Sequence, residues 1–362
     1  MKKYVAAWLW MVSSGMLAAF PKSDPPGKVK AFSFRENDTT AYVLNLAYDA
    51  AGQPSYFYRN IFTPVCYTGE CKPVYVNFYW DLLGNYIRYD LPEGKTLTKM
   101  DHKEFDEANY DKLQQILSDP ESLLKDVTIY DLIGPDTDKL RDSVDAKTGA
   151  TLKTIKNEVI EGAVYTCYTL WHIAYGKGCG EMKRLTDSLM TDDLLHAFLQ
   201  SQNFHYQYFA MEKVVGNPAF LNDWLTVIRG KNPFVARAAL QKLDPQVFAS
   251  DDRQVWLWET YRRAGYTLQL AILKKLETIP VRPALAGTLA EALPAANAEQ
   301  TGYFLGILRK GKPSVAVARK LAATLATATP GQGEEVYRLL DSWKLADRAV
   351  RDQLKKWKQT HE

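Results

Sequence analysis

The clearest chemical signal in this chain is a seven-residue stretch, Asp-Ala-Lys-Thr-Gly-Ala-Thr, at positions 145–151. Thr151 supplies a hydroxyl group, and Gly149 and Ala150 keep side-chain bulk low immediately before it, so a ligand could approach the backbone closely. An amphipathic run follows, which places Thr151 at the predicted first turn of a helix. Helix starts carry unpaired N–H groups and the positive end of the helix dipole. The pattern therefore predicts a phosphate site at Thr151.

The stretch resembles the Asp-x-x-Ser/Thr-Gly-Ala-Thr signature of flavinylated FMN-binding domains. That family includes the C subunit of sodium-pumping NADH:quinone oxidoreductase and the G subunit of the related Rnf complex. In the family the last Thr is esterified to the FMN phosphate. A dedicated FAD:protein FMN transferase, which uses a divalent metal, needs the first Asp. The resemblance implies covalent FMN on Thr151 and a role in transfer for Asp145, with Thr148, Gly149 and Ala150 in the remaining matched positions.

A plain helix start is the alternative interpretation of the same residues. Asp145 and Thr148 are good capping residues, and Gly-Ala begins helices in many proteins. Lys147 and Lys153 could add positive charge beside a phosphate or could face water. The resemblance covers the seven residues and, loosely, the strand-then-helix order around them.

Aromatic residues after the motif could stack on a flavin ring, but their helical spacing favours core packing. These are Tyr165, Tyr168, Trp171 and Tyr175. Trp80 and Asp81 could border a ring at a strand end, and His102 and His172 could approach it. The five histidines show no metal-ligand pairing, so no metal site is predicted. The glycine-rich residues 176–180 look like a phosphate loop, but they follow a helix and lack Gly-Lys-Ser/Thr, which favours a linker.

The N-terminus has the pattern of an export signal over residues 1–20. Lys2 and Lys3 precede an apolar stretch, Tyr4 to Phe20, and small residues near Ala19 suit cleavage. The stretch is at the short limit for a membrane span, so an uncleaved anchor is the alternative. We therefore expect an extracytoplasmic protein, periplasmic or secreted, with membrane association left open.

An even number of cysteines in an exported chain favours disulfides. The four are Cys66, Cys71, Cys167 and Cys179, and three pairings are possible. The local pairing, Cys66–Cys71 with Cys167–Cys179, closes two short loops. A redox dithiol at Cys66 and Cys71 is disfavoured because the spacing is wider than Cys-x-x-Cys.

The expected fold class is an α+β domain over residues 28–178, an antiparallel sheet with helices, followed by an all-α domain over 181–362. Val, Tyr, Phe and Thr are frequent up to Tyr89, and alternation predicts strands at 40–48, 56–62, 74–80 and 86–89. Helical spacing begins near residue 104 and continues after the motif on one apolar face that includes Val159, Ala163 and Ile173.

Helical runs recur through the second domain, and Asn-Pro or Asp-Pro pairs mark several starts, at 217–218, 232–233 and 244–245. Eleven runs are predicted, from Asp192–Gln200 to Ala346–Gln359, in an order that resembles HEAT repeats. With 46% hydrophobic and 24% charged residues the chain is globular, and a net charge of +3 without a basic run excludes nucleic acid as an expected partner.

Two functions are consistent with these observations. In the first, the chain is an exported electron carrier whose helical domain docks a redox partner protein or a membrane electron-transfer complex, with a transferase attaching FMN. In the second, the helical array is a binding scaffold for a protein or glycan, and the first domain is structural and free of cofactor.

Overall fold

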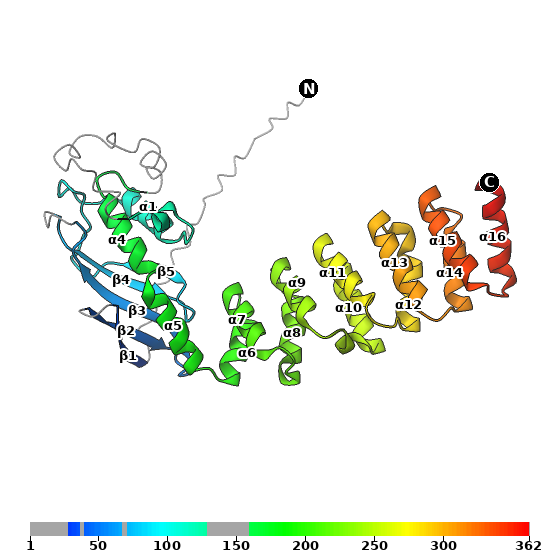
Figure 1. Ribbon diagram of the computed structural model, residues 1–362, viewed down its shortest axis with the longest axis horizontal. Helices are drawn as coiled ribbons and strands as arrows, with labels where there is room; N and C mark the ends of the chain where they lie inside the picture. Colours follow the sequence, from blue (N-terminus) through cyan, green and yellow to red (C-terminus); the bar gives the residue numbers. More distant parts are fainter. Residues whose placement is uncertain (1–27, 37–39, 67–70, 129–158, 362) are drawn as a thin grey trace, which may run out of the picture. The chain divides into compact units, whose positions relative to one another are not determined.

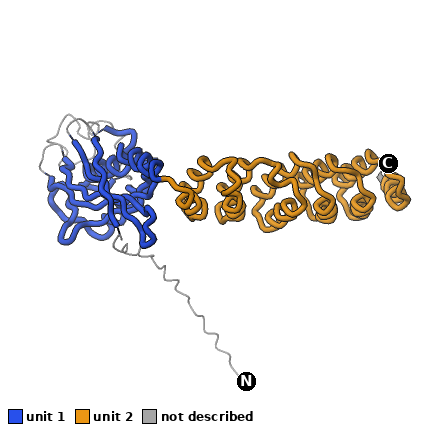
Figure 2. The backbone as a smooth tube through the Cα atoms, turned by 90° about the horizontal axis from the view of Figure 1, so that it is seen from below, with its two compact units in different colours: residues 1–189 blue, residues 190–362 orange. Residues whose placement is uncertain are grey.

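The computed structural model describes residues 28–36, 40–66, 71–128 and 159–361. The chain divides into two compact units, residues 1–189 and 190–362 (Figure 2). Unit 1 holds the sheet and its helices, and unit 2 is helical throughout its described length (Figure 1). The expected order of an α+β domain followed by an all-α domain is confirmed.

Unit 1 is built on a five-stranded antiparallel sheet in which each strand pairs with its neighbour in sequence. The strands are β1 (Lys28–Arg35), β2 (Ala41–Tyr48), β3 (Pro54–Thr63), β4 (Val74–Trp80) and β5 (Tyr86–Asp90). The predicted strands are therefore confirmed, and β1 is an addition that pairs with β2 along its whole length. Tight turns join β2 to β3 and β4 to β5, because Gly52 and Gly84 adopt positive φ at these bends.

One face of the sheet carries the core of unit 1. Helix α1 (Glu107–Leu117) and helix α4 (Val164–Ala174) lie against the sheet and pack on each other (Figure 1). The indole Nε1 of buried Trp80 donates to the carbonyl oxygen of Ala174 at 2.8 Å, which ties β4 to the end of α4. Alternation along each strand explains this face, because every second side chain points toward the helices. Its buried apolar members include Leu44, Leu46, Phe57, Ile61, Val76, Phe78 and Trp80.

The opposite face of β3 and β4 is polar and aromatic. Asn60 Nδ2 donates to Asn77 Oδ1 at 2.7 Å, and the ring centroids of Phe62 and Tyr75 lie 4.4 Å apart. Phe62 is 60% exposed. Cross-strand pairs of this kind stabilise a sheet through side-chain contact rather than through the core.

The sequence predicted a helix that includes Val159 and Ala163, but neither residue is helical in the structure. Helix α4 begins only at Val164, and residues 159–163 form a turn. Gly162 adopts a φ of 74°, and its carbonyl oxygen accepts from Met100 N at 2.7 Å. A residue in the left-handed conformation interrupts the hydrogen bonding of a helix, so Gly162 ends any helix at this point. The apolar spacing in the sequence continues on both sides of this break, which is why it predicted one longer helix.

The expected linker at residues 176–180 is also wrong, because these residues begin helix α5 (Lys177–Ser188). Thr186 Oγ1 donates to Leu82 O at 2.5 Å, which attaches α5 to the β4–β5 turn. A Cβ on Gly84 would lie 2.6 Å from Cys179 O, so this turn fits against α5 only without a side chain. Tertiary packing thus outweighs the low helix propensity of the glycines.

Unit 2 consists of helices that coincide, within a few residues at their ends, with the eleven predicted runs. The side chain of Asn232 caps a helix whose first residue is Pro233, as the sequence predicted. Thr329 caps the helix that begins at Pro330 in the same way, a start that the sequence pattern had placed two residues later. The helices are α6 (Asp192–Gln200), α7 (Phe204–Val214), α8 (Leu221–Ile228), α9 (Pro233–Lys242), α10 (Asp251–Arg263), α11 (Tyr266–Leu276), α12 (Pro283–Ala292), α13 (Ala298–Lys310), α14 (Val315–Thr324), α15 (Pro330–Trp343) and α16 (Arg348–His361).

These helices form a series of hairpins (Figure 1). The first helices of the hairpins begin at residues 192, 221, 251, 283, 315 and 348, so the repeat is about 30 residues long. Each second helix from α7 to α13 packs against the second helix of the next hairpin, and the last helix, α16, packs against α14 and α15. Contacts are therefore made mainly between neighbours, which is the arrangement of a helical repeat protein.

Polar side chains connect the hairpins at repeated positions. Lys275 Nζ donates to Leu243 O at 2.8 Å, and Lys310 Nζ donates to Glu277 O at 2.9 Å. In both cases the second helix of one hairpin supplies a lysine near its end. This lysine donates a hydrogen bond to a carbonyl group at or just beyond the end of the second helix of the preceding hairpin. Only a few residues of each repeat take part, so the regularity leaves a weak trace in the sequence.

Candidate functional site

The predicted flavin-attachment residues lie outside the described residues. Asp145, Thr148, Gly149, Ala150 and Thr151 all belong to residues 129–158, between the short helix η1 (Leu123–Asp126) and α4. Attachment of FMN at Thr151 therefore remains a prediction. The described structure shows what surrounds both ends of this segment.

The aromatic residues of α4 have structural roles. Trp171 Nε1 donates to Asp119 O at 2.9 Å, and Tyr175 OH, just after the helix, donates to Leu117 O at 2.8 Å. Both bonds satisfy carbonyl groups at and just beyond the C-terminus of α1, which a helix cannot satisfy internally. Burial raises the pKa of the Tyr175 hydroxyl. The packing role that the helical spacing favoured is confirmed for these two side chains.

The histidines and the strand-end residues also serve the fold. His172 Nε2 lies 3.1 Å from Leu124 O, and burial lowers the pKa of this imidazole. His102 is exposed and occupies a turn with a φ of 60°. Asp81 accepts from Leu83 N and from both Asn85 N and Nδ2 at 2.8 to 2.9 Å, so its carboxylate holds the β4–β5 turn. None of these contacts requires a bound cofactor.

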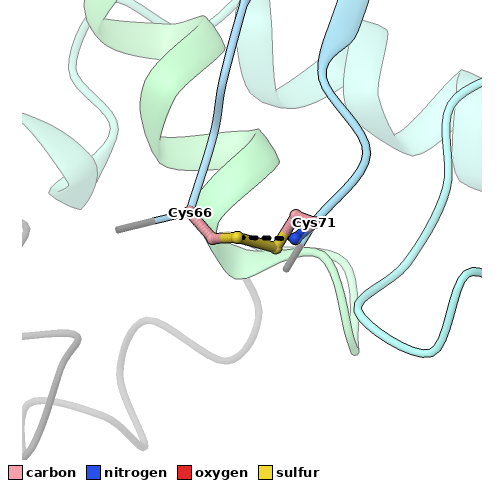
Figure 3. Close-up of a disulfide and its surroundings, with 2 residues drawn as sticks. All are labelled: Cys66 and Cys71. Atoms are coloured by element: carbon pink, nitrogen blue, oxygen red, sulfur yellow. Dashed lines mark hydrogen bonds between the residues drawn. A yellow bond between two sulfur atoms is a disulfide. The ribbon is translucent and has the colours of Figure 1, made fainter. Parts of the chain in front are cut away.

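The cysteines follow the predicted local pairing only in part. Cys66 and Cys71 form a disulfide that closes the connection between β3 and β4, with Cα atoms 5.8 Å apart (Figure 3). Cys167 and Cys179 are free thiols, so the second predicted bridge is wrong. Each thiol bonds to the backbone instead: Cys167 Sγ accepts from Ile160 N, and Cys179 Sγ donates to Ala174 O.

Both free thiols are poor nucleophiles because they remain protonated. Burial raises the pKa of Cys167 to about 11 and that of Cys179 to about 12. A reactive cysteine needs a lowered pKa and access to solvent. Cys167 lacks both features, since its side chain is fully buried in the core.

A small recess in unit 1 gathers residues of a different character. It lies between the core face of the sheet and the start of α5, with Arg59, Glu36, Gly176 and Gly178 beside an apolar wall that includes Trp80. Its volume of about 10 Å³ is what one water molecule requires. A tricyclic flavin ring does not fit this recess.

Arg59 is the unusual residue of the recess. It lies on β3 between Phe57 and Ile61, on the core face of the sheet, and is only 9% exposed. Its guanidinium carbon lies 3.3 Å from the centre of the Tyr42 ring. Within the described parts of the chain, no carboxylate lies at ion-pair distance from it. Burial lowers the pKa of this guanidinium, which still stays protonated at neutral pH.

The N-terminus of α5 forms another side of the recess. Gly176 precedes the helix, and no side chain caps its first turn. A Cβ on Gly178 would lie 3.4 Å from Phe34 Cζ and 3.8 Å from Met182 Cε, so it would line the recess in ordinary contact. The recess therefore combines a buried cation with a helix start.

Sequence reasoning missed Arg59, although a signal was present. In β3 the alternation Phe57, Arg59, Ile61 places a charged residue in the register of the core. A charge at such a position needs a partner, which the strand pattern alone does not identify.

The described residues of the chain include no helix with the length and apolar character needed to cross a membrane. Comparison with protein-family models, with curated proteins and with solved structures finds no match to this chain.

Proposed function

We propose that this chain is an exported flavoprotein electron carrier with FMN bound covalently through the hydroxyl of Thr151. The observation that carries the proposal is the match of residues 145–151 to the flavinylation signature at every position that the signature specifies. A FAD:protein FMN transferase is the enzyme that would attach the cofactor. In this reaction Thr151 Oγ bonds to the FMN phosphorus, the pyrophosphate bond of FAD breaks, and AMP leaves.

Features of unit 1 support this proposal indirectly. The unit is an α+β domain with an antiparallel sheet, as the resemblance implied. Leu124 before the motif and Ile160 after it are both buried in the core of the unit, and His172 on α4 contacts the Leu124 carbonyl. The motif thus connects two anchored elements of a single unit. Covalent attachment would retain the cofactor outside the cytoplasm, where free FMN is scarce.

In this proposal the helical repeats of unit 2 dock the redox partner, either a protein or a membrane electron-transfer complex. Three successive second helices carry an exposed aromatic side chain at their first or second residue: Phe204 on α7, Phe234 on α9 and Tyr266 on α11. Phe234 is 71% exposed. Exposed aromatic residues on successive helices are typical of surfaces that bind other proteins.

The test is flavinylation in a host that also produces the transferase. We expect the denatured wild-type protein to keep yellow in-gel fluorescence and to gain the mass of FMN less water. Thr151→Ala should abolish both signals while the circular dichroism spectrum is retained. Thr154→Ala is the matched control, because it removes a nearby hydroxyl that lies outside the signature. Colourless wild-type protein, or flavin that persists in Thr151→Ala, would contradict the proposal.

A binding scaffold without cofactor is the second candidate function. The observation that favours it is the helical repeat itself, because such arrays present extended surfaces to partners. If the wild-type protein stays colourless in the presence of an active transferase, this second function becomes the better account of the chain.

A further inference from the structure

Among the described residues, no carboxylate lies at ion-pair distance from Arg59, and the Glu36 carboxylate attracts its charge only from farther away. The neighbours of Arg59 on the core face, Phe57 and Ile61, are apolar, and its closest partner is the Tyr42 ring. A cation–π contact attracts a guanidinium, but the loss of hydration on burial is much larger. Buried charges in proteins are normally paired. An anion that enters the recess would therefore complete the pairing of this charge.

The groups around the recess also favour an anion. The first turn of α5 has no side-chain cap, so its N–H groups and dipole present positive potential. Lys177 begins this helix, and its Nζ lies 3.1 Å from the backbone oxygen of Glu36. Among the residues that line the recess, Glu36 is the only one with a negative charge, and its carboxylate opposes this positive potential.

We infer that the recess at Arg59 binds the oxyanion group, carboxylate or phosphate, of a small solute. The planar guanidinium fork matches the oxygens of both groups. The recess holds about one water-sized atom, so one ligand oxygen enters it and the remainder of the solute stays at the mouth. Gly178 keeps the space open, because any larger residue would place its Cβ there.

Binding can be measured on flavin-free protein, so the result is independent of the proposed function. Isothermal titration at constant ionic strength with inorganic phosphate, and separately with acetate, distinguishes the two sources of oxyanion. We expect saturable one-to-one binding of at least one of them to the wild-type protein. Arg59→Gln should weaken the association at least tenfold.

Gly178→Ala is the second variant, because it retains every charge and fills the recess. The added Cβ makes ordinary contacts with Phe34 and Met182, and alanine favours a helix, so the fold is expected to persist. We expect at least tenfold weaker binding in this variant as well. Lys183→Gln on the same helix is the matched control, because Lys183 is exposed and does not line the recess. It should bind as the wild type does.

Three results would overturn the inference. The first is that neither anion shows saturable binding to the wild type. The second is that binding survives in both Arg59→Gln and Gly178→Ala. The third is that saturable binding occurs only in a Glu36→Gln variant. The third result would show that Glu36 itself pairs with Arg59 in solution and closes the recess.

Discussion

The last two helices of unit 2 provide a sharp test of packing. Gly333 lies buried in α15, and a Cβ at this position would come within 3 Å of three atoms of the Trp357 ring on α16. Trp357 and Val350 are the buried side chains of this terminal helix. Gly333→Ala therefore forces the indole to move, although alanine is the better helix former.

The magnitudes of the opposing effects can be compared. Alanine in place of glycine inside a helix stabilises it by about 1 kcal/mol. Overpacking of a rigid ring typically costs about 1–3 kcal/mol. Complete expulsion of a tryptophan that buries about 200 Å² would cost about 5 kcal/mol as an upper limit. Because the indole and the α15 backbone are both rigid, we expect a net loss of about 2 kcal/mol in the docking of α16.

Amide hydrogen exchange is the suitable assay, because a repeat array opens locally and does not unfold in two states. Protection of amides in α16, at Val350 and beyond, should fall in Gly333→Ala, while amides in α6 to α9 keep their wild-type protection. Gly331→Ala is the control on the same helix, because nothing lies within 4 Å of its added Cβ. It should leave α16 protected.

A second substitution separates steric conflict from other effects. In a Trp357→Leu background the smaller side chain leaves room for the methyl group, so Gly333→Ala should no longer reduce protection further. The reasoning is refuted if Gly333→Ala raises the protection of α16, as a propensity effect alone would. It is equally refuted if the loss is the same with and without Trp357.

Three further predictions concern unit 1. Replacing both Cys66 and Cys71 with serine should lower the free energy of unfolding in urea by about 2 kcal/mol, the loop-entropy value for so short a loop, and reduction of the wild type should have the same effect. The buried thiol of Cys167 has a pKa of about 11 against an ordinary value near 9, so the folded state holds its proton more tightly. The contribution of this thiol to the free energy of unfolding is therefore complete below pH 9 and is lost as the pH rises toward 11. The urea midpoint of the wild type should fall over this range, and it should fall less in Cys167→Ala. Trp80→Phe removes the hydrogen bond to the Ala174 carbonyl, which still accepts from Cys179 Sγ. We therefore expect the free energy of unfolding in urea to fall by about 1 kcal/mol. An unchanged free energy would show that this bond does not stabilise the fold.

Local signals explain why the helices of unit 2 could be predicted from sequence. Asn232 before Pro233 caps α9 through contacts within three residues, so no distant part of the chain decides where this helix begins. The strands of unit 1 were predictable for a similar reason, since alternation such as Val74 to Trp80 reports directly which side chains face a core.

The errors arose where distant contacts decide the structure. Residues 176–180 are poor helix formers in isolation, and they become helical because the β4–β5 turn and Phe34 pack against them. Cys167 and Cys179 are close in sequence, but each thiol takes a backbone partner instead. The recess at Arg59 needs the sheet and α5 together, so neither segment reveals it alone.

The glutamine contacts between hairpins of unit 2 constrain how this protein can change in length. Gln300 Nε2 donates to Gln269 Oε1, and Gln332 Nε2 donates to Thr301 Oγ1, each across 31 residues. Loss of a single helical turn would displace such a side chain from its acceptor and leave a half-buried amide unsatisfied. Removal of a complete hairpin would instead bring the glutamine of the following hairpin to the position that the removed glutamine had occupied. Evolution or engineering can therefore shorten or extend this array most readily in whole hairpins.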